Sequence, residues 1–309
     1  MKILSTSSSF GEDPEVFKII SEKGLSFISN PFGRTLTEEE GVSLIQQHKP
    51  IGLLAGTGPL KERALRAGHP RLKVISRIGA GWDNVDCKLA EELGIKVCRT
   101  ADAPTQAVVE LTIGLFLDLS RMISLQDRLI RRNQWEKKMG YLVHGKVLGI
   151  LGCGRIGKGV ALAMRALGCR VQACDLYPDI EWLKRNGVDL VPDILSLFRT
   201  SDLLSIHADS GNGPKSLIDE EILAHAKRGL LLVNVARGYM VDEPSLITAL
   251  QRGTVRGAAL DVFEREPYVG PLSSMEQVIL TPHIGSHTRE TRVRMETEAI
   301  ENLLKGLQL

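Results

Sequence analysis

The chain has 309 residues, 43% of them hydrophobic and 25% charged, a composition typical of a globular protein and unlike that of a disordered one. A single hydrophobic core rarely extends beyond about 250–300 residues, so two domains are expected. The net charge of +2, from 39 Lys and Arg against 37 Asp and Glu, is too balanced to indicate a nucleic-acid partner.

The N-terminal segment and the cysteines indicate the compartment. Residues 1–17 contain one lysine and a two-residue apolar stretch, which does not fit a signal peptide. No segment approaches the roughly 18 uninterrupted apolar residues of a membrane span. The five cysteines are odd in number and form no Cys-x-x-Cys pair, so reduced thiols and a cytoplasmic protein without membrane contact are expected.

Short, mostly apolar runs alternate along the chain with polar segments of helix length. Apolar runs without strict alternation are typical of strands covered on both faces, and helix-length spacers between them favour a parallel α/β sheet. The predicted strands are 51–55, 72–75, 94–98, 147–151, 170–174, 202–206, 230–234, 257–261 and 277–281.

One long helix is predicted from Thr105 to about Arg132. Its first half is apolar around most of its circumference and its second half is basic. A helix that is apolar on nearly all sides is buried on nearly all sides. A core helix and a helix between domains or subunits both satisfy this pattern, and the length favours a connecting role.

The main chemical signal is a glycine pattern directly after the strand 147–151. Gly152, Gly154 and Gly157 form Gly-x-Gly-x-x-Gly and lead into a helix at 160–167. In such a turn the first glycine allows the sharp bend, the second admits a pyrophosphate, and the third allows helix and strand to pack closely. The N–H groups at the helix start then face the phosphates.

Two further residues favour a dinucleotide over a mononucleotide. A P-loop requires Ser or Thr after Gly157-Lys158, and Gly159 stands there. Asp175 ends the next predicted strand at the spacing expected of an acid that binds ribose hydroxyls. Its charge would repel the extra phosphate of NADP, so NAD is the predicted cofactor. The fingerprint lies so far along the chain that a separate domain is expected to precede it.

The proton carrier is predicted by elimination to be a histidine. The sequence contains no Tyr-x-x-x-Lys pair, no Cys and His clustering suited to zinc, and no Gly-x-Ser-x-Gly elbow. His283, which stands between Pro282 and Ile284, comes directly after the predicted strand 277–281. Arg237 and Glu266 each follow another predicted strand. Each of these alone is more commonly a surface or loop residue. Together, behind a dinucleotide fingerprint, they predict an active site at the carboxyl edge of the sheet.

From residue 52 to 288 the chain resembles the D-isomer-specific 2-hydroxyacid dehydrogenase family, which includes phosphoglycerate, D-lactate, glycerate and formate dehydrogenases. Six motifs occur in the family's order. They are Arg77–Asp86, Val108–Thr112, Gly145–Gly157, Asn234–Gly238, Asp261–Phe263 with Glu266–Pro267, and Thr281–Gly285.

The resemblance implies a set of catalytic and substrate-binding roles. His283 would donate a proton to the substrate oxygen during reduction, and Glu266 would orient its ring. Arg237 would bind the carboxylate and the reacting oxygen. Backbone N–H groups at Gly79, Ala80 and Gly81 would hold the other side of that carboxylate. The implied substrate is a small D-2-hydroxy acid or its 2-oxo acid.

The resemblance also implies how NAD is held. Asp261 and backbone near Val235 would bind the nicotinamide carboxamide and fix which face of the ring reacts. The full set of implied cofactor contacts is Gly152, Gly154, Arg155, Ile156, Gly157, Asp175, His207, Val235, Asp261 and His283.

The architecture implied by the resemblance is α/β, with two doubly wound parallel-sheet domains. A flavodoxin-like substrate domain comprises residues 1–98 and 286–309, and a Rossmann NAD domain is inserted at 99–285. Catalysis is expected in the cleft between them, with closure expelling water. The helix region 105–132 resembles the family's dimer-forming segment, which implies a homodimer.

Two departures from the family pattern bear on the substrate. Many members have an arginine after the third strand, where this chain reads Leu53–Pro59. Its loss weakens the case for a phosphorylated substrate, with Arg77 as the remaining phosphate contact. The loop 205–214 also differs from the usual His-x-Pro-Leu-Thr pattern. An NAD-sensing interaction module and a dehydrogenase of a compact anion such as formate remain as alternatives.

Overall fold

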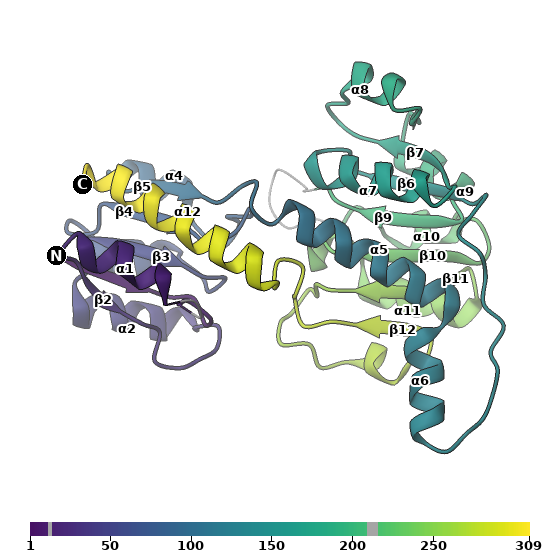
Figure 1. Cartoon of the computed structure of the whole chain (residues 1–309), viewed down its shortest axis with the longest axis horizontal. Coiled ribbons are helices and arrows are strands. Elements are labelled where there is room, and N and C mark those ends of the chain that lie inside the picture. Colours follow the sequence, from purple (N-terminus) through teal and green to yellow (C-terminus); the bar gives the residue numbers. More distant parts are fainter. Residues whose placement is uncertain (12–13, 209–215) are drawn as a thin grey trace. The chain divides into compact units, whose positions relative to one another are not determined.

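The computed structural model describes residues 1–11, 14–208 and 216–309, and divides into two compact units (Figure 1). Unit 1 comprises Met1–Pro104 and Ser286–Leu309, and unit 2 comprises Thr105–Gly285. The chain leaves unit 1 a few residues later than the expected position 98. Thr100 and Ala103 are buried within unit 1, where the Thr100 N–H donates to the Arg77 carbonyl at 3.2 Å.

Unit 1 is built on a parallel sheet of five strands in the order β2-β1-β3-β4-β5. This order is that of flavodoxin-like folds, and it confirms the predicted class of the unit. The strands are β1 (Lys2–Ser5), β2 (Ser26–Ile28), β3 (Gly52–Ala55), β4 (Val74–Arg77) and β5 (Lys96–Arg99); the helices are α1 (Glu15–Glu22), α2 (Glu38–His48), α3 (Glu62–Gly68), α4 (Cys87–Glu92) and α12 (Arg289–Leu307).

Adjacent residues of the unit 1 strands face two different cores. Leu53 and Ile75 pack in the cluster that contains residues of α2 and α3, whereas Leu54 and Val74 pack in the cluster that contains residues of α1 and α12. Helices on both faces of a parallel sheet explain why its strands are continuous apolar runs.

Unit 2 is built on a parallel sheet of seven strands in the order β12-β11-β10-β9-β6-β7-β8. The chain order reverses between β6 and β9, which is where open α/β sheets bind ligands. The strands are β6 (Val147–Leu151), β7 (Arg170–Cys174), β8 (Asp189–Leu190), β9 (Leu203–Ile206), β10 (Leu230–Asn234), β11 (Val255–Leu260) and β12 (Val278–Leu280); the helices are α5 (Thr105–Arg121), α6 (Ile123–Arg131), α7 (Arg155–Ala166), α8 (Ile180–Arg185), α9 (Ile194–Thr200), α10 (Glu220–Ala224), α11 (Glu243–Arg252) and the 3-10 turns η1 (Gly238–Met240) and η2 (Pro271–Ser274).

All nine predicted strands are present, some displaced by one or two residues, and three further strands were not predicted. Two of these, β2 and β8, have three and two residues and no fully buried position. The third, β1, mixes a lysine and a serine with two apolar residues. Strands this short or this polar do not form the apolar runs by which the others were recognised.

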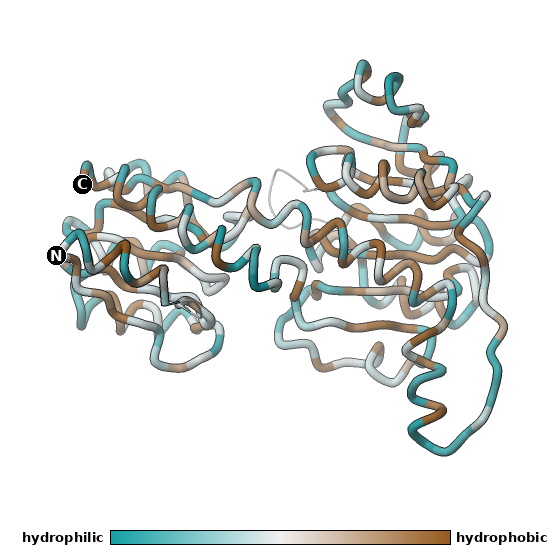
Figure 2. The backbone as a smooth tube through the Cα atoms, in the orientation of Figure 1, coloured by the Kyte–Doolittle hydropathy of each residue, from teal (hydrophilic) through white to brown (hydrophobic). Residues whose placement is uncertain are grey.

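The single helix predicted at 105–132 is wrong, because the structure breaks it at Met122. Met122 has φ +52°, in the left-handed region, which ends α5 and starts α6 in a new direction. The Asp118 side chain accepts a hydrogen bond from the Ser124 N–H at 2.8 Å and so caps the first turn of α6. Figure 2 shows the contrast in hydropathy between the largely apolar α5 and the mixed α6. No helix in the described part of the chain is both long enough and apolar enough to span a bilayer.

Candidate active site

His283, Glu266 and Arg237 follow three neighbouring strands of unit 2. His283 lies beyond β12, Glu266 beyond β11 and Arg237 beyond β10, and these strands pair directly in the sheet. Since the strands are parallel, their carboxyl ends lie at the same edge, and the structure brings the three side chains together there.

The closest contact in this group joins His283 to Glu266. The Nδ1 atom of His283 lies 2.9 Å from Oε2 of Glu266, and Oε1 accepts the Phe263 N–H at 3.1 Å. Because a carboxylate only accepts, the proton of the ring is on Nδ1, and Nε2 remains for a substrate. Burial raises the pKa of Glu266, but the hydrogen bond from His283 and its charge outweigh burial and hold that pKa below its ordinary value.

Arg237 is placed by a tight turn after β10. The Asn234 side chain donates to the Arg237 carbonyl at 2.9 Å and accepts the Ala236 N–H at 3.1 Å. The next residue, Gly238, lies so close to Phe263 that a Cβ would fall 1.8 Å from its carbonyl carbon. This contact joins the turns that follow β10 and β11, and the charge of Arg237 contributes to the lowered pKa of Glu266.

The buried carboxylate of Asp261 fixes the backbone on both sides of His283. His283 has φ +56°, which is uncommon for a residue other than glycine. Asp261, 1% exposed, accepts the Thr281 hydroxyl at 2.6 Å and the N–H groups of Ile284 and Gly285, each at 2.8 Å. Asp261 therefore fastens the chain on both sides of His283.

The glycine turn between β6 and α7 has the shape required of a phosphate cradle. Gly152 has φ +88°, and a Cβ there would lie 2.6 Å from the Ala208 nitrogen. A Cβ on Gly157 would lie 2.3 Å from the Gly152 carbonyl oxygen. A Cβ on Gly154, by contrast, would meet nothing within 4 Å. The protein itself requires Gly152 and Gly157, whereas Gly154 leaves space for a ligand at the first turn of α7. These residues fit the pyrophosphate of a dinucleotide.

Asp175 follows β7 beside the glycine turn. Its Oδ2 accepts the Cys153 N–H at 2.6 Å and its Oδ1 accepts the Tyr177 N–H at 2.8 Å. These contacts fix the carboxylate next to the turn, and each oxygen keeps a second lone pair for a hydroxyl group.

His207 follows β9, next to the point where the strand order reverses. Its Nε2 contacts the Ser205 hydroxyl, and burial lowers the pKa of the ring to about 3, so the imidazole is neutral. The His207 carbonyl carbon would lie 2.8 Å from a Cβ on Gly152. Most of the atypical loop lies at 209–215, outside the described residues.

In unit 1, the loop after β4 presents backbone N–H groups. The Gly79 N–H is already donated to the buried Thr100 hydroxyl at 2.7 Å, and Arg77 donates to the Ile78 carbonyl. Within the described ranges, the N–H groups of Ala80 and Gly81 have no hydrogen-bond acceptor. They are therefore the available donors.

Arg99, the last residue of β5, contacts this loop and was not predicted from the sequence as a site residue. It donates to the Ala80 carbonyl at 3.0 Å, and its guanidinium carbon lies 4.1 Å from the centre of the Trp82 ring. It ends β5 directly opposite Arg77 at the end of β4. The available signal was the placement of two arginines one or two residues beyond the ends of two successive predicted strands, 72–75 and 94–98.

Comparisons with known proteins agree with this geometry. The sequence model for "D-isomer specific 2-hydroxyacid dehydrogenase, NAD binding domain" matches residues 113–285. A glyoxylate reductase of Korarchaeum cryptofilum is 34% identical over 94% of this chain and 92% of its own length. The chain belongs to the D-isomer-specific 2-hydroxyacid dehydrogenase family. It therefore carries the NAD-binding domain of this family of oxidoreductases, which confirms the predicted family and cofactor.

Other relatives of this chain differ in length. A D-3-phosphoglycerate dehydrogenase of Methanocaldococcus jannaschii is 35% identical over 95% of the chain, but the chain covers only 56% of that protein. Among solved structures, the TT0316 protein of Thermus thermophilus superposes with a TM-score of 0.89 at 31% identity, covering 100% of this chain and 97% of that one.

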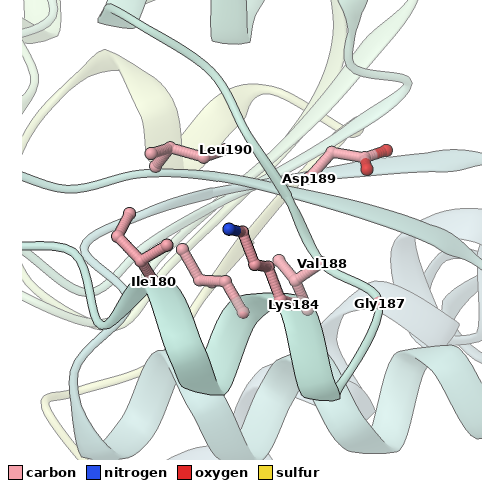
Figure 3. Close-up of a pocket in the computed structure, with 7 residues that line it drawn as sticks. Ile180, Lys184, Gly187, Val188, Asp189 and Leu190 are labelled. Carbon is pink, nitrogen blue, oxygen red and sulfur yellow. The ribbon is translucent and has the colours of Figure 1, made fainter.

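Unit 2 also contains a hollow between α8 and β8, away from the residues described above. Figure 3 shows Lys184 extending from α8 toward this space, with Ile180 and Leu190 on its apolar side. The Asp189 carboxylate points away from it. The hollow shares no residue with the group of Arg237, Glu266 and His283, with the glycine turn or with Asp175.

Proposed function

We propose that this protein is an NAD-dependent dehydrogenase that interconverts a small D-2-hydroxy acid and its 2-oxo acid. The observation that carries the proposal is the 2.9 Å contact between His283 and Glu266, with Arg237 beside them at one edge of an NAD-binding sheet. This arrangement supplies a proton carrier, a carboxylate that orients it, and a cation for an acid headgroup.

The roles follow from the chemistry of each side chain. Nε2 of His283 gives a proton to the carbonyl oxygen of the 2-oxo acid during reduction and takes it back during oxidation. Glu266 keeps the ring in the required tautomer and stabilises its charged form. Arg237 pairs with the substrate carboxylate and polarises the reacting oxygen. When bound, NAD supplies or accepts the hydride.

The cofactor contacts are proposed from the same elements. The turn at Gly152–Gly157, with the first N–H groups of α7, holds the pyrophosphate, and Asp175 binds the ribose. The His207 region and the Val235 backbone lie at the carboxyl ends of β9 and β10, on the nicotinamide side. Asp261 has both oxygens engaged by the His283 turn, and one lone pair of Oδ2 remains for the carboxamide.

The substrate is proposed to be small. The backbone donors of Ala80 and Gly81 suit a carboxylate, and Arg77 stands at the same loop. The glycine at position 56, after β3, offers no cation for a phosphate. Of the relatives compared above, the glyoxylate reductase is matched over nearly its whole length, whereas the phosphoglycerate dehydrogenase is much longer.

A homodimer in the cytoplasm is the proposed assembly. Large apolar side chains are exposed along α6 and the segment after it, where a second copy would cover them. They are Ile123, Ile130, Trp135, Met139 and Leu142, with exposed fractions of 55%, 49%, 84%, 86% and 73%.

The deciding experiment follows NADH absorbance while a panel of 2-oxo acids is offered, and NAD reduction with formate and 2-hydroxy acids as donors. We expect rapid reduction of at least one small 2-oxo acid. His283→Ala should lower the rate by about 100-fold or more, because the proton carrier is lost. His225→Ala is the matched control, because His225 is an exposed histidine that directly follows α10, and this variant should keep full activity.

Inertness toward every acid, with NAD-dependent self-association, would instead favour an interaction module. Turnover of formate alone would favour the compact-anion dehydrogenase.

A further inference from the structure

We infer that Arg99 is a positioning residue of the substrate-carboxylate loop, acting by orienting and polarising the peptide group between Ala80 and Gly81. The inference rests on the proposed function, since it assigns this loop to the acid group of the substrate. Arg99 does not itself touch the substrate in this proposal.

Among the described residues, the loop after β4 keeps the N–H groups of Ala80 and Gly81 as donors for an anion. The peptide group between Ile78 and Gly79 is engaged at both ends, by Arg77 at the carbonyl and by Thr100 at the N–H. In the part of the chain that the structure describes, the Gly81 N–H has no acceptor, and the residue is only half-buried. An anion that binds this loop therefore meets the Gly81 N–H, with that of Ala80 beside it.

The direction of the Gly81 N–H depends on Arg99. The peptide bond between Ala80 and Gly81 is trans, so its carbonyl and its N–H point in opposite directions. Arg99 binds the carbonyl at 3.0 Å. It therefore fixes the direction of the N–H on the other side of the same peptide plane. A charged donor on the carbonyl also makes the N–H a stronger donor, because hydrogen bonds in a chain polarise one another.

Arg99 is itself held in place by Trp82 and Asn302. Its guanidinium lies over the Trp82 ring at 4.1 Å, a stacked geometry that suits a planar cation. Its own carbonyl accepts a hydrogen bond from the Asn302 side chain of α12 at 3.4 Å. Arg99 forms no ion pair with a carboxylate among the described residues, so its charge remains available to the loop.

The test is a comparison of Arg99→Met, Arg99→Lys and the matched surface control Arg66→Met, an exposed arginine of α3 in the same unit. Arg99→Met should raise KM for the best 2-oxo acid, and Kd for oxamate in the NADH complex, by about tenfold. Since NADH does not use this loop, KM for NADH should stay within about twofold. Arg99→Lys should recover part of the loss by keeping the charge, and Arg66→Met should behave as wild type.

The outcomes separate this inference from the proposed function. If wild type reduces a 2-oxo acid and Arg99→Met leaves KM for the acid and Kd for oxamate unchanged, the inference is overturned while the function stands. If Arg99→Met weakens acid and NADH equally, with a lower thermal midpoint, Arg99 is merely structural and the inference is again overturned. If wild type neither reduces an acid nor binds oxamate, both proposals fail.

Discussion

Both units present polar groups at the carboxyl edge of a parallel sheet, but the chemical groups differ. In unit 2 the groups are side chains: an arginine, a glutamate and a histidine after three neighbouring strands. In unit 1 they are the backbone N–H groups of Ala80 and Gly81, and Arg99 binds the carbonyl end of the peptide group that carries the Gly81 N–H. Side-chain sites follow from sequence motifs, whereas a backbone site depends on how each peptide plane is held.

The largest expected effect tests the glycine turn of unit 2. Gly154→Val places a side chain in open space, so the protein should fold normally and lose NADH affinity by about 100-fold, because the pyrophosphate is displaced. Titration of NADH fluorescence and a thermal melt measure the two properties. Gly157→Ala makes the opposite control, since its Cβ would meet the Gly152 carbonyl oxygen at 2.3 Å and should lower the melting temperature. Tight NADH binding by Gly154→Val would contradict the assignment.

The next effect concerns the charge beside His283. The lowered pKa of Glu266 means that its negative form and the positive ring stabilise each other. Glu266→Gln removes the carboxylate that accepts the His283 Nδ1–H, so the ring is no longer held for proton transfer and the rate of reduction should fall about tenfold near neutral pH. Because the pKa of Glu266 is lowered, the wild-type rate should decline only at a pH below the ordinary pKa range of a glutamate, and this decline should be absent in Glu266→Gln. A pH–rate profile of the variant that matches that of the wild type would contradict the role of this carboxylate.

A smaller effect on kcat is expected when the hydrogen bond between Thr281 and Asp261 is removed. Thr281→Val removes one of the three hydrogen bonds to Asp261 and leaves those of Ile284 and Gly285. The turn loosens but its carboxylate stays paired, so kcat should fall about threefold to tenfold with KM for NADH unchanged. Steady-state kinetics against both substrates checks the split. An effect confined to KM for NADH would point to the carboxamide role of Asp261 instead.

The smallest effect on activity, but a measurable one on stability, belongs to unit 1. Thr100→Val leaves the buried Gly79 N–H without its acceptor, at a cost of about 1–3 kcal/mol in the free energy of unfolding. Because Gly79 is not among the available donors, KM for the acid should change by less than about threefold. Urea unfolding followed by steady-state kinetics measures both, and a large rise in KM without loss of stability would contradict this division of roles.

Sequence patterns predicted much of the molecule. Strands buried on both faces are apolar runs, and so nine of them were recognisable, as were the parallel sheets that they form. The glycine spacing and the polar residues after strands identified the NAD turn and brought Arg237, Glu266 and His283 into one group. The sequence did not reveal the break at Met122, because the methionine carries no sign of a left-handed backbone.

What the sequence by itself determined about this protein is its class, its cofactor and the identity of the groups at the edge of the unit 2 sheet, because strand ends and glycine turns are local in the chain. Only the tertiary structure decided which N–H groups of the unit 1 loop are free, that Asp261 fastens both sides of His283, and that Arg99 binds the Ala80 carbonyl. These contacts join residues about 20 positions apart, and their directions depend on how individual peptide planes and side chains are oriented, which no residue pattern encodes.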